Sequence, residues 1–176
     1  GDTEFILYDI NDNYSRYVVV VEGIQFTSGG GGGSIRATMS IDNGTNFVTT
    51  ANYCYHSFGY NSWVTTITQA NSAIQAYVQI TNNTIADSLT AGSAADLEIS
   101  MHNLAKLKFN VCKYIKAHGA YTDNASGQVT ILNMAGTNIT NTSLLQNPVN
   151  AVRFFASSSS FIGGNVRVYG YKKALI

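Results

Sequence analysis

Short segments in which apolar and polar residues alternate with a period of two run through most of this chain. In the clearest of them, residues 34–41, four side chains predicted to face the core alternate with four predicted to face outward: Ile35, Ala37, Met39 and Ile41 against Ser34, Arg36, Thr38 and Ser40. This is the period of a half-buried β-strand, because successive strand side chains point to opposite faces of a sheet. No stretch shows convincing helical periodicity, and the nearest to one, residues 65–76, is rich in threonine and alternates as well. The chain is therefore limited to folds built from strands.

The other predicted strands are separated by loops rich in Gly, Ser, Asn or Asp, which favour turns. They span residues 17–26, 47–55, 73–81, 96–101, 107–115, 128–132, 151–155 and 165–171. The β-branched run at 17–26 predicts a central strand. Within 73–81 and 96–101 the residues expected on one face are Ile74, Ala76, Val78 and Ile80, and then Leu97, Ile99 and Met101. Many short strands with regular turns predict one all-β domain over residues 1–176, an antiparallel β-sandwich of jelly-roll-like form.

Charged residues are scarce, because they make up 11% of the 176 residues and the formal net charge is zero. A typical globular chain has about 25%, so Asn, Ser and Thr must keep this chain in solution. We expect no nucleic-acid partner, since binding phosphates needs a basic surface. No stretch reaches the roughly 20 apolar residues of a membrane span, so we expect no membrane insertion. The lysines form no run. The nearest to one, which comprises Lys106, Lys108, Lys113 and Lys116, is expected to form a solvated face or to protect a strand edge.

The start of the chain and its cysteines bear on where the protein works. Gly1-Asp2-Thr3 has neither Met nor a basic-then-apolar leader, so we expect a processed or excised piece of a longer chain. Cys54 and Cys112 either form a disulfide or remain buried thiols, and the lack of a leader favours the thiols.

An uninterrupted run of glycines extends from Gly29 to Gly33. Glycine has no side chain to pack and loses the most backbone entropy on ordering, so we expect a mobile hairpin loop here. A phosphate-binding loop would need a following helix and a Lys-Ser/Thr pair, whereas a predicted strand follows this run.

The segment 40–47 resembles an Asp-box turn, Ser-x-Asp-x-Gly-x-Thr-Trp, through Ser40, Asp42 and Gly44, with Phe47 in the place of Trp. Asn46 replaces the usual Thr. Asp42 is predicted to accept hydrogen bonds from the backbone N–H groups that follow it, and Gly44 to supply a positive φ. Phe47 is expected to pack behind the turn. Such a turn carries no chemistry, so its expected role is structural.

Aromatic residues are the best candidates for a binding site. They crowd the segment 53–63, and their apolar faces with polar tips suit sugars and protein receptors. Tyr53, Tyr55 and Phe58 fit the sandwich core as well as they fit a binding surface. The residues selected as candidate ligand contacts are His56, Tyr60, Trp63 and Tyr121.

Nothing in the sequence predicts catalysis, a metal or a cofactor. His56, His102 and His118 lack the spacing of metal ligands, and no Ser, Cys or Thr lies in a nucleophile elbow. Asp96 and Glu98 share a strand face, but like-charged neighbours are common on exposed faces. We therefore expect no catalytic residue, no metal site and no cofactor.

The end of the chain predicts a strand with two different faces. Val166, Val168 and Gly170 alternate with Arg167, Tyr169 and Tyr171 after a Gly163-Gly164 turn, and the two valines are expected inside the sandwich. The stretch 164–172 resembles the ending small-Gly-x-Ile-Arg-Leu-Tyr-Gly-x-Lys. Its motif residues here are Gly164, Arg167, Tyr169, Gly170 and Lys172.

That ending is similar to the one that closes the C-terminal β-sandwich (fibre-tip) domains of bacteriophage tail fibres and tail spikes and of phage-derived trimeric adhesins. Positions nearer the start also resemble this family: Tyr14, Tyr17, Asp42, Gly44, Phe47 and Tyr53. Between about residues 57 and 127 nothing matches, and loops there would carry specificity.

The resemblance implies a non-enzymatic homotrimer in a virion tail fibre or spike, or an extracellular adhesin, that binds a host cell-surface glycan or protein. A second interpretation is a virion structural component, such as a head fibre or a capsid decoration domain. A polysaccharide hydrolase is a third, weakened by the lack of a visible acid pair.

Overall fold

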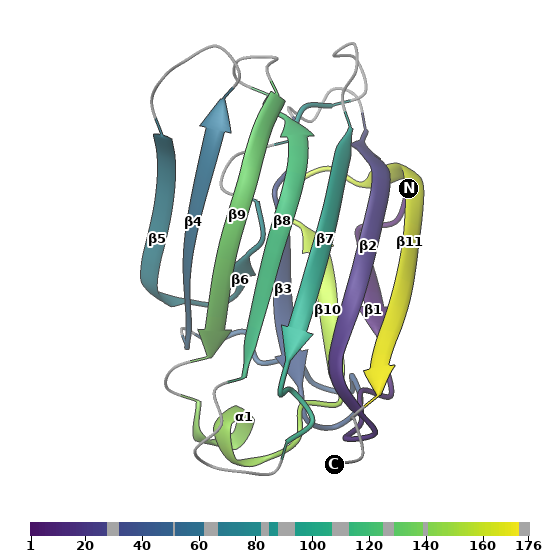
Figure 1. The fold of residues 1–176 in the computed structure, drawn as a ribbon, viewed down its shortest axis with the longest axis vertical. Helices are drawn as coiled ribbons and strands as arrows, with labels where there is room; N and C mark the ends of the chain where they lie inside the picture. Colours follow the sequence, from purple (N-terminus) through teal and green to yellow (C-terminus); the bar gives the residue numbers. More distant parts are fainter. Residues whose placement is uncertain are drawn as a thin grey trace.

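Two β-sheets packed face to face form most of the part of the chain that the computed structural model describes (Figure 1). The structure describes residues 1–27, 32–50, 52–61, 67–81, 85–87, 94–106, 113–124, 129–138 and 141–172. The small sheet has the strand order β1 (Glu4–Leu7), β10 (Ala151–Ala156), β3 (Ile35–Ser40) and β6 (Val78–Gln79). The large sheet has the order β11 (Phe161–Lys172), β2 (Tyr14–Phe26), β7 (Ala95–His102), β8 (Tyr114–Thr122), β9 (Val129–Asn138), β4 (Tyr53–Asn61) and β5 (Ile67–Gln75). One short helix, α1 (Thr142–Gln146), lies at the lower end in Figure 1.

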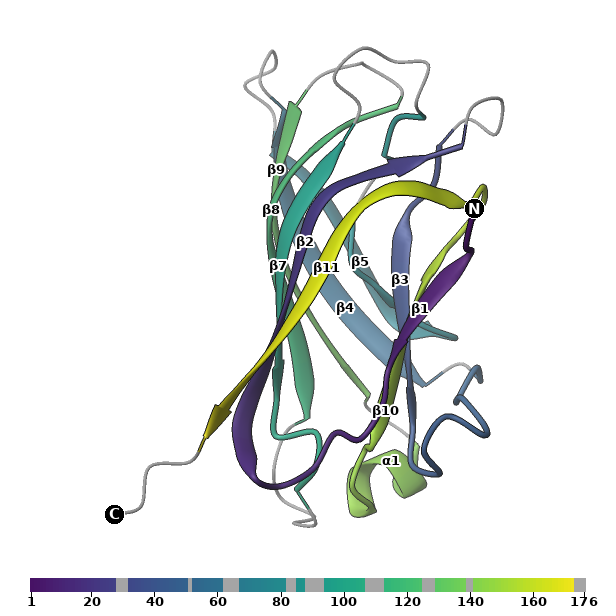
Figure 2. The same cartoon turned by 90° about the vertical axis from the view of Figure 1, so that its right-hand side faces the viewer.

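The expected antiparallel β-sandwich is confirmed, since every pair of neighbouring strands in the two sheets is antiparallel. The chain crosses repeatedly between the sheets, as in a jelly roll: β1, β3, β6 and β10 lie in one and their sequence neighbours in the other. Figure 2 shows the two layers side-on. Because the chain leaves the large sheet and returns to it several times, segments far apart in sequence become neighbours on one sheet.

The core lies between the sheets and is formed by the inward positions of both. Ile35, Ala37 and Met39 from β3 are buried as predicted, and so are Leu97, Ile99 and Met101 from β7. The run in β2 is also buried and lies inside the large sheet, between β11 and β7. Burying one such aliphatic side chain stabilises the fold by about 1.5–3 kcal/mol.

The outer face of β3 differs from the prediction, because Ser34, Thr38 and Ser40 are buried as well. A long side chain from a neighbouring strand covers Thr38. The guanidinium of Arg153 on β10 lies over the ring of Phe47 at 4.8 Å, and its Nε donates a hydrogen bond to Thr38 Oγ1. The period-two pattern correctly predicted which face of the strand these side chains lie on. It did not predict that they are buried on that face.

Two predicted strands have different limits in the structure. The segment 73–81 is divided, because β5 ends at Gln75 in the large sheet and β6 begins at Val78 in the small one. Val78 and Ile80 are buried as expected, whereas Ile74 is exposed, so one shared face for the segment was wrong. The strand predicted from 47 to 55 begins only at Tyr53. Of the strand predicted at 107–115, residues 107–112 lie outside the described part.

The terminal strand β11 forms as predicted, but its valines do not lie in the core. Val166 and Val168 pair with Val21 and Val19, so they share the inward face with two fully buried residues. Their own side chains are 40% and 44% exposed. The large sheet is wider than the small one, and Figure 2 shows the lower half of β11 running away from β1 and β10. No strand of the described chain covers this part of the inward face.

The last two residues of the glycine run, Gly32 and Gly33, make hydrogen bonds to other segments. Gly33 exchanges two backbone hydrogen bonds with Ile85, and Ser158 and Ser159 donate to the carbonyl of Gly32. A Cβ on Gly33 would lie 2.7 Å from the Phe26 ring. Residues 29–31 lie outside the described part, as does Cys112, so the state of the cysteines stays a prediction.

Lys113 is buried, which corrects the expectation of a solvated face for this lysine. Its ammonium donates hydrogen bonds to the carbonyls of Leu144, at 2.9 Å, and Asn147, at the end of α1. Cations are favoured there, because the last helical carbonyls have no partners within the helix. Burial lowers the pKa of Lys113 to about 8.

Candidate functional site

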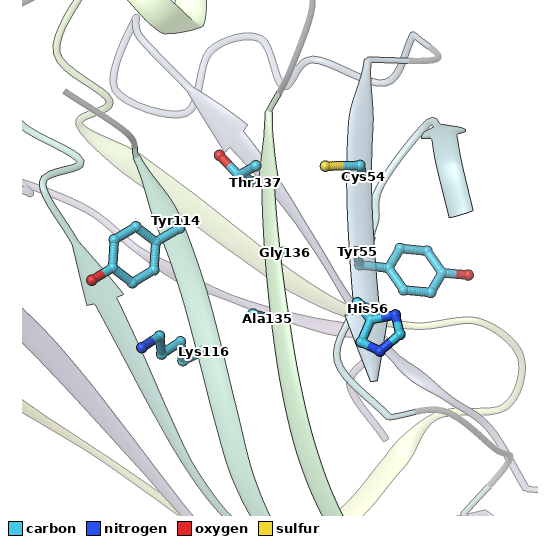
Figure 3. A pocket seen from close by; sticks show the side chains of 8 residues that line it. All are labelled: Cys54, Tyr55, His56, Tyr114, Lys116, Ala135, Gly136 and Thr137. Carbon is cyan, nitrogen blue, oxygen red and sulfur yellow. The ribbon is translucent and has the colours of Figure 1, made fainter. Parts of the chain in front are cut away.

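A shallow groove runs along β9 on the outer face of the large sheet, and we call it the β9 groove. Its walls come from β8 and β4, with Tyr114 and Lys116 on one side and His56 on the other (Figure 3). Its floor is formed by Ala135, Gly136 and Thr137 of β9. The hollow measures about 410 Å³ and continues into a second one of about 270 Å³, which His118 and Phe58 also line.

The groove exists because small residues on β9 lie between large ones on both neighbouring strands. Lys116, Ala135 and His56 are direct cross-strand partners in one row, and His118, Asn133 and Phe58 form the next row. Adjacent strands are about 4.8 Å apart, so the two walls stand roughly 10 Å from each other. That width suits the face of a single flat ring.

Contacts between side chains organise the walls. On β4 the rings of His56 and Phe58 meet edge to face with centroids 4.5 Å apart. On the other side the ring of Tyr114 is stacked on that of His102 at 4.6 Å, and the Lys116 ammonium lies 5.3 Å from the Tyr114 centroid. Burial lowers the pKa of His102, and the positive charges of Arg16 and Lys116 lower it further. Tyr114 is thus fixed by a ring that stays neutral at neutral pH.

The groove offers chemistry for binding rather than for bond cleavage. Its apolar surfaces are flanked by groups that donate or accept hydrogen bonds, namely His56, Lys116, His118, Asn133 and Thr137. None of the residues that line the two hollows carries a carboxylate. An aromatic and aliphatic surface with a few polar groups is the usual composition of a small-ligand site.

The predicted ligand contacts are dispersed by the structure. His56 lines the β9 groove. Tyr60 is exposed on the same outer face, but its cross-strand neighbours are Ile131 and Ile67, beyond the groove. Trp63 lies outside the described residues. Tyr121 is wrong as a ligand contact, because it is 1% exposed and its position on β8 points into the core.

Sequence reasoning missed most of the groove, which includes Tyr114, Lys116, His118 and Asn133. A signal for the first three was available, since they alternate with the buried Ile115 and Ala117. Their position beside His56 was not readable, because it depends on β8 and β4 both pairing with β9.

The Asp-box-like turn has the predicted geometry. Asp42 accepts hydrogen bonds from the Ser40 hydroxyl, at 2.6 Å, and from the backbone N–H and side-chain amide of Asn46. Gly44 has a φ of +84°, as the turn requires, and a Cβ on it would lie 3.5 Å from the Phe47 ring. These bonds stabilise the carboxylate and lower the pKa of Asp42 to about 2.

The hydroxyl of Tyr53 links the two ends of this turn. This hydroxyl accepts a hydrogen bond from the backbone N–H of Met39 and donates one to the carbonyl of Val48. Burial raises its pKa to about 12, so the phenol remains protonated and keeps donating over the physiological range. The turn is thereby joined to the core, in line with a structural role.

The turn predicts an acid-dependent stability. The pKa of Asp42 is lower in the folded chain than its ordinary value of 3.8, so its contribution is complete above about pH 4 and lost as the pH falls toward about 2. We expect Asp42→Asn to be less stable than wild type at pH 6 and to lose less stability between pH 4 and pH 2. Denaturant unfolding at several pH values measures both slopes, and parallel slopes would contradict the assignment.

Each residue of the C-terminal motif has a defined place on β11. Gly164 has a φ of +96° at a break in the register with β2, and a Cβ there would lie 2.7 Å from the carbonyl oxygen of Glu22. Arg167 forms an ion pair with Glu22 at 2.6 Å. A Cβ on Gly170 would lie 2.5 Å from the ring of Tyr14. Tyr169 pairs with Val18, and Lys172 ends the strand.

No family model matches the chain, and no curated protein or solved structure matches it significantly. Among the described residues no helix is long and apolar enough to cross a membrane. The same part of the chain contains no group of three or more His, Cys, Asp or Glu side chains placed to hold a metal ion.

Proposed function

We propose that this chain is a non-enzymatic receptor-binding module of a virion surface, or of an extracellular adhesin, and that it binds a host cell-surface saccharide in the β9 groove. The observation that carries the proposal is the groove itself: an apolar floor between Tyr114, His56 and Phe58, with polar groups at its rim and no lining carboxylate. Aromatic walls separated by about the width of one ring can pack against the apolar face of a sugar. The polar groups at the rim can form hydrogen bonds with its hydroxyls.

The fibre-tip resemblance supports a place at the end of a tail fibre or spike. The motif residues that suggested it occupy special positions: Gly164 at a register break, Gly170 beneath Tyr14, and Arg167 in an ion pair. We propose a homotrimer on the same grounds. No cofactor enters this function, and no nucleic acid or membrane insertion is part of it.

A virion structural role, in a head fibre or a capsid decoration domain, is the second candidate. It needs the same sandwich but no ligand, so a chain that binds no receptor favours it. A protein receptor is the other outcome for the binding module, and cell attachment without glycan binding would indicate one.

A polysaccharide hydrolase is the third candidate, and the carboxylates on the outer face argue against it. Glu22, Asp96 and Glu98 line an adjoining hollow on β2, β7 and β8, which shares His118 with the groove. Asp96 Oδ1 accepts a hydrogen bond from the Gly23 N–H at 2.7 Å, and Glu22 is paired with Arg167. Two of the three acids thus have structural partners, whereas glycoside hydrolysis uses a pair of free carboxyl groups. Release of sugar from capsule polysaccharide would overturn this conclusion.

Glycan-array binding by the wild type and two groove variants tests the proposal. We expect Ala135→Trp to abolish binding, because an indole on the floor fills the space between His56 and Lys116. His56→Ala should weaken it at least tenfold, or about 1.4 kcal/mol. The matched control is Asn71→Ala, since Asn71 is the cross-strand neighbour of His56 but lies outside the groove. Unchanged binding by Ala135→Trp would exclude the groove as the site.

A further inference from the structure

We infer that copies of this chain assemble head to tail, with the β11 edge of one copy packed against the β5 edge of the next. This inference names the surfaces through which the copies of the proposed trimer contact each other. It rests on the proposed function only for the number of copies. The surfaces are named here the β11 strip, formed by Ile162, Val166, Val168, Tyr169 and Tyr171, and the β5 strip, formed by Tyr60, Ile67, Ile74, Val129 and Ile131.

The exposed apolar side chains of the described chain are concentrated at these two places. Of the large hydrophobic residues that are exposed, only Tyr8 and Phe58 belong to neither strip, and Phe58 borders the β5 strip from the groove side. β11 and β5 are the two opposite edges of the large sheet. In the β5 strip, Tyr60 of β4 lies between Ile67 of β5 and Ile131 of β9, so the strip extends from the edge strand onto the outer face. Exposed apolar surface of this kind usually marks an interaction site, and here it occurs at both edges of the sheet.

Both edge strands also lack the usual protection against pairing with another chain. β5 contains no charged residue and no proline along its nine residues. β11 contains Arg167, which is paired with Glu22, and Lys172 at its very end. Its register with β2 is regular from Asn165 to Tyr171. Long edges without inward charges, prolines or central bulges are templates for association.

The inward face of β11 adds a surface that a single chain leaves uncovered. From Ile162 to Lys172 every residue of the strand is exposed, so both of its faces are accessible. Val166 and Val168 continue the inward row of Val21 and Val19 past the edge of the small sheet. A neighbouring copy seated there would extend the core instead of meeting a polar surface.

The dimensions fit a second copy. At a rise of about 3.3 Å per residue, β5 and β11 are roughly 30 and 40 Å long. With strands about 4.8 Å apart and sheets about 10 Å thick, one face and the rim of β11 offer on the order of 600 Å². This is most of what one partner contributes to a standard specific interface, roughly 800 Å². Two charges beside the β11 strip already have partners within the chain, because Arg167 is paired with Glu22 and the guanidinium of Arg16 lies over the Tyr171 ring at 4.3 Å.

Two different strips favour a head-to-tail contact over a symmetric one. A two-fold contact of β11 with β11 would use one strip twice and leave the β5 strip uncovered. A head-to-tail contact covers both, and such contacts close into rings when the rotation permits. For the proposed trimer, each copy then gives its β11 strip to one neighbour and its β5 strip to the other.

Light scattering on two charged variants, alone and mixed, tests this arrangement. Wild type is expected at three times the 18.9 kDa of one chain. Val168→Asp damages only the β11 strip and Ile67→Asp only the β5 strip, so each alone should be a monomer. Mixed in equal amounts they should form a dimer, because one undamaged strip remains on each partner. Tyr8→Asp, which places the same charge outside both strips, should keep the wild-type mass.

A monomeric wild type overturns the inference, and so does an Ile67→Asp variant that keeps its assembly, because the contact would then not involve β5. Circular dichroism must show both variants folded; if one is not, Tyr169→Asp or Ile74→Asp replaces it on the same strip. A ring with a different number of copies, in which the two variants still combine when mixed, overturns the proposed trimer but not the head-to-tail contact. Saccharide binding is read separately, since neither Val168 nor Ile67 lines the groove.

Discussion

Gly119→Ala is expected to destabilise the chain by about 2–6 kcal/mol, combining a strained backbone with an overpacked site. Gly119 lies on β8 opposite Leu97 and has a φ of +151°. A Cβ there would lie 2.1 Å from the carbonyl oxygen of Asp96 and 2.8 Å from the Cα of Leu97. Both obstacles are backbone atoms, so relief requires β7 to move. Against a typical total stability of about 5–15 kcal/mol, the change is large.

Thermal unfolding measures this effect, and Gly163→Ala is the matched control. For a chain of this size the melting temperature should fall by about 2–4 °C per kcal/mol. A Cβ on Gly163 would meet only the flexible Gln25 side chain, at 4.0 Å, so that variant should melt close to wild type. Equal melting temperatures for the two variants would show that β7 and β8 adapt without cost.

The fold class was predictable because the period of two is a local property of the sequence. Ile35, Ala37 and Met39 alternate with polar residues and face the core without any knowledge of the strand order. The width of each sheet, by contrast, is not local. Val166 and Val168 have the pattern of core residues and the correct orientation, yet they project past the small sheet. Whether a side chain is buried depends on what lies opposite it in the other sheet. The alternation of apolar and polar residues carries no information about that.

The candidate site was predictable only in part, for a related reason. His56 was found because aromatic residues cluster around it in the sequence. Lys116 and Ala135 are its row partners only because β8 and β4 flank β9, and this strand order was not readable. Tyr121 was wrongly assigned to a binding surface because a tyrosine does not by itself indicate whether it faces the core or the solvent. Its neighbours on β8 do, since Ile115 and Ala117 are buried at the same parity.

The loss of the terminal strand is the other large effect. Truncation after Gly164 is expected to give insoluble protein, although Val166 and Val168 are 40% and 44% exposed within one chain. The backbone ladder between β11 and β2, from Asn165 to Lys172, would be lost, and each ladder bond is worth about 0.5–1.5 kcal/mol net. β2 would then become an edge, and its β-branched run would present free N–H and C=O groups along its length. The ion pair of Arg167 with Glu22 and the packing of Tyr14 on Gly170 would disappear as well.

The matched control separates the ladder from the side chains. The double variant Val166→Ser, Val168→Ser keeps β11 paired with β2 and removes apolar side chains that are 40% and 44% exposed in a single chain. It should therefore stay soluble and folded, with the head-to-tail contact weakened and its mass shifted toward the monomer. The soluble fraction after expression, followed by light scattering, distinguishes the two. A soluble, cooperatively folded truncation would mean that the sandwich is complete without β11 and that the strand serves assembly alone. An insoluble double variant would mean that the valines are needed within each chain, despite their exposure in the structure.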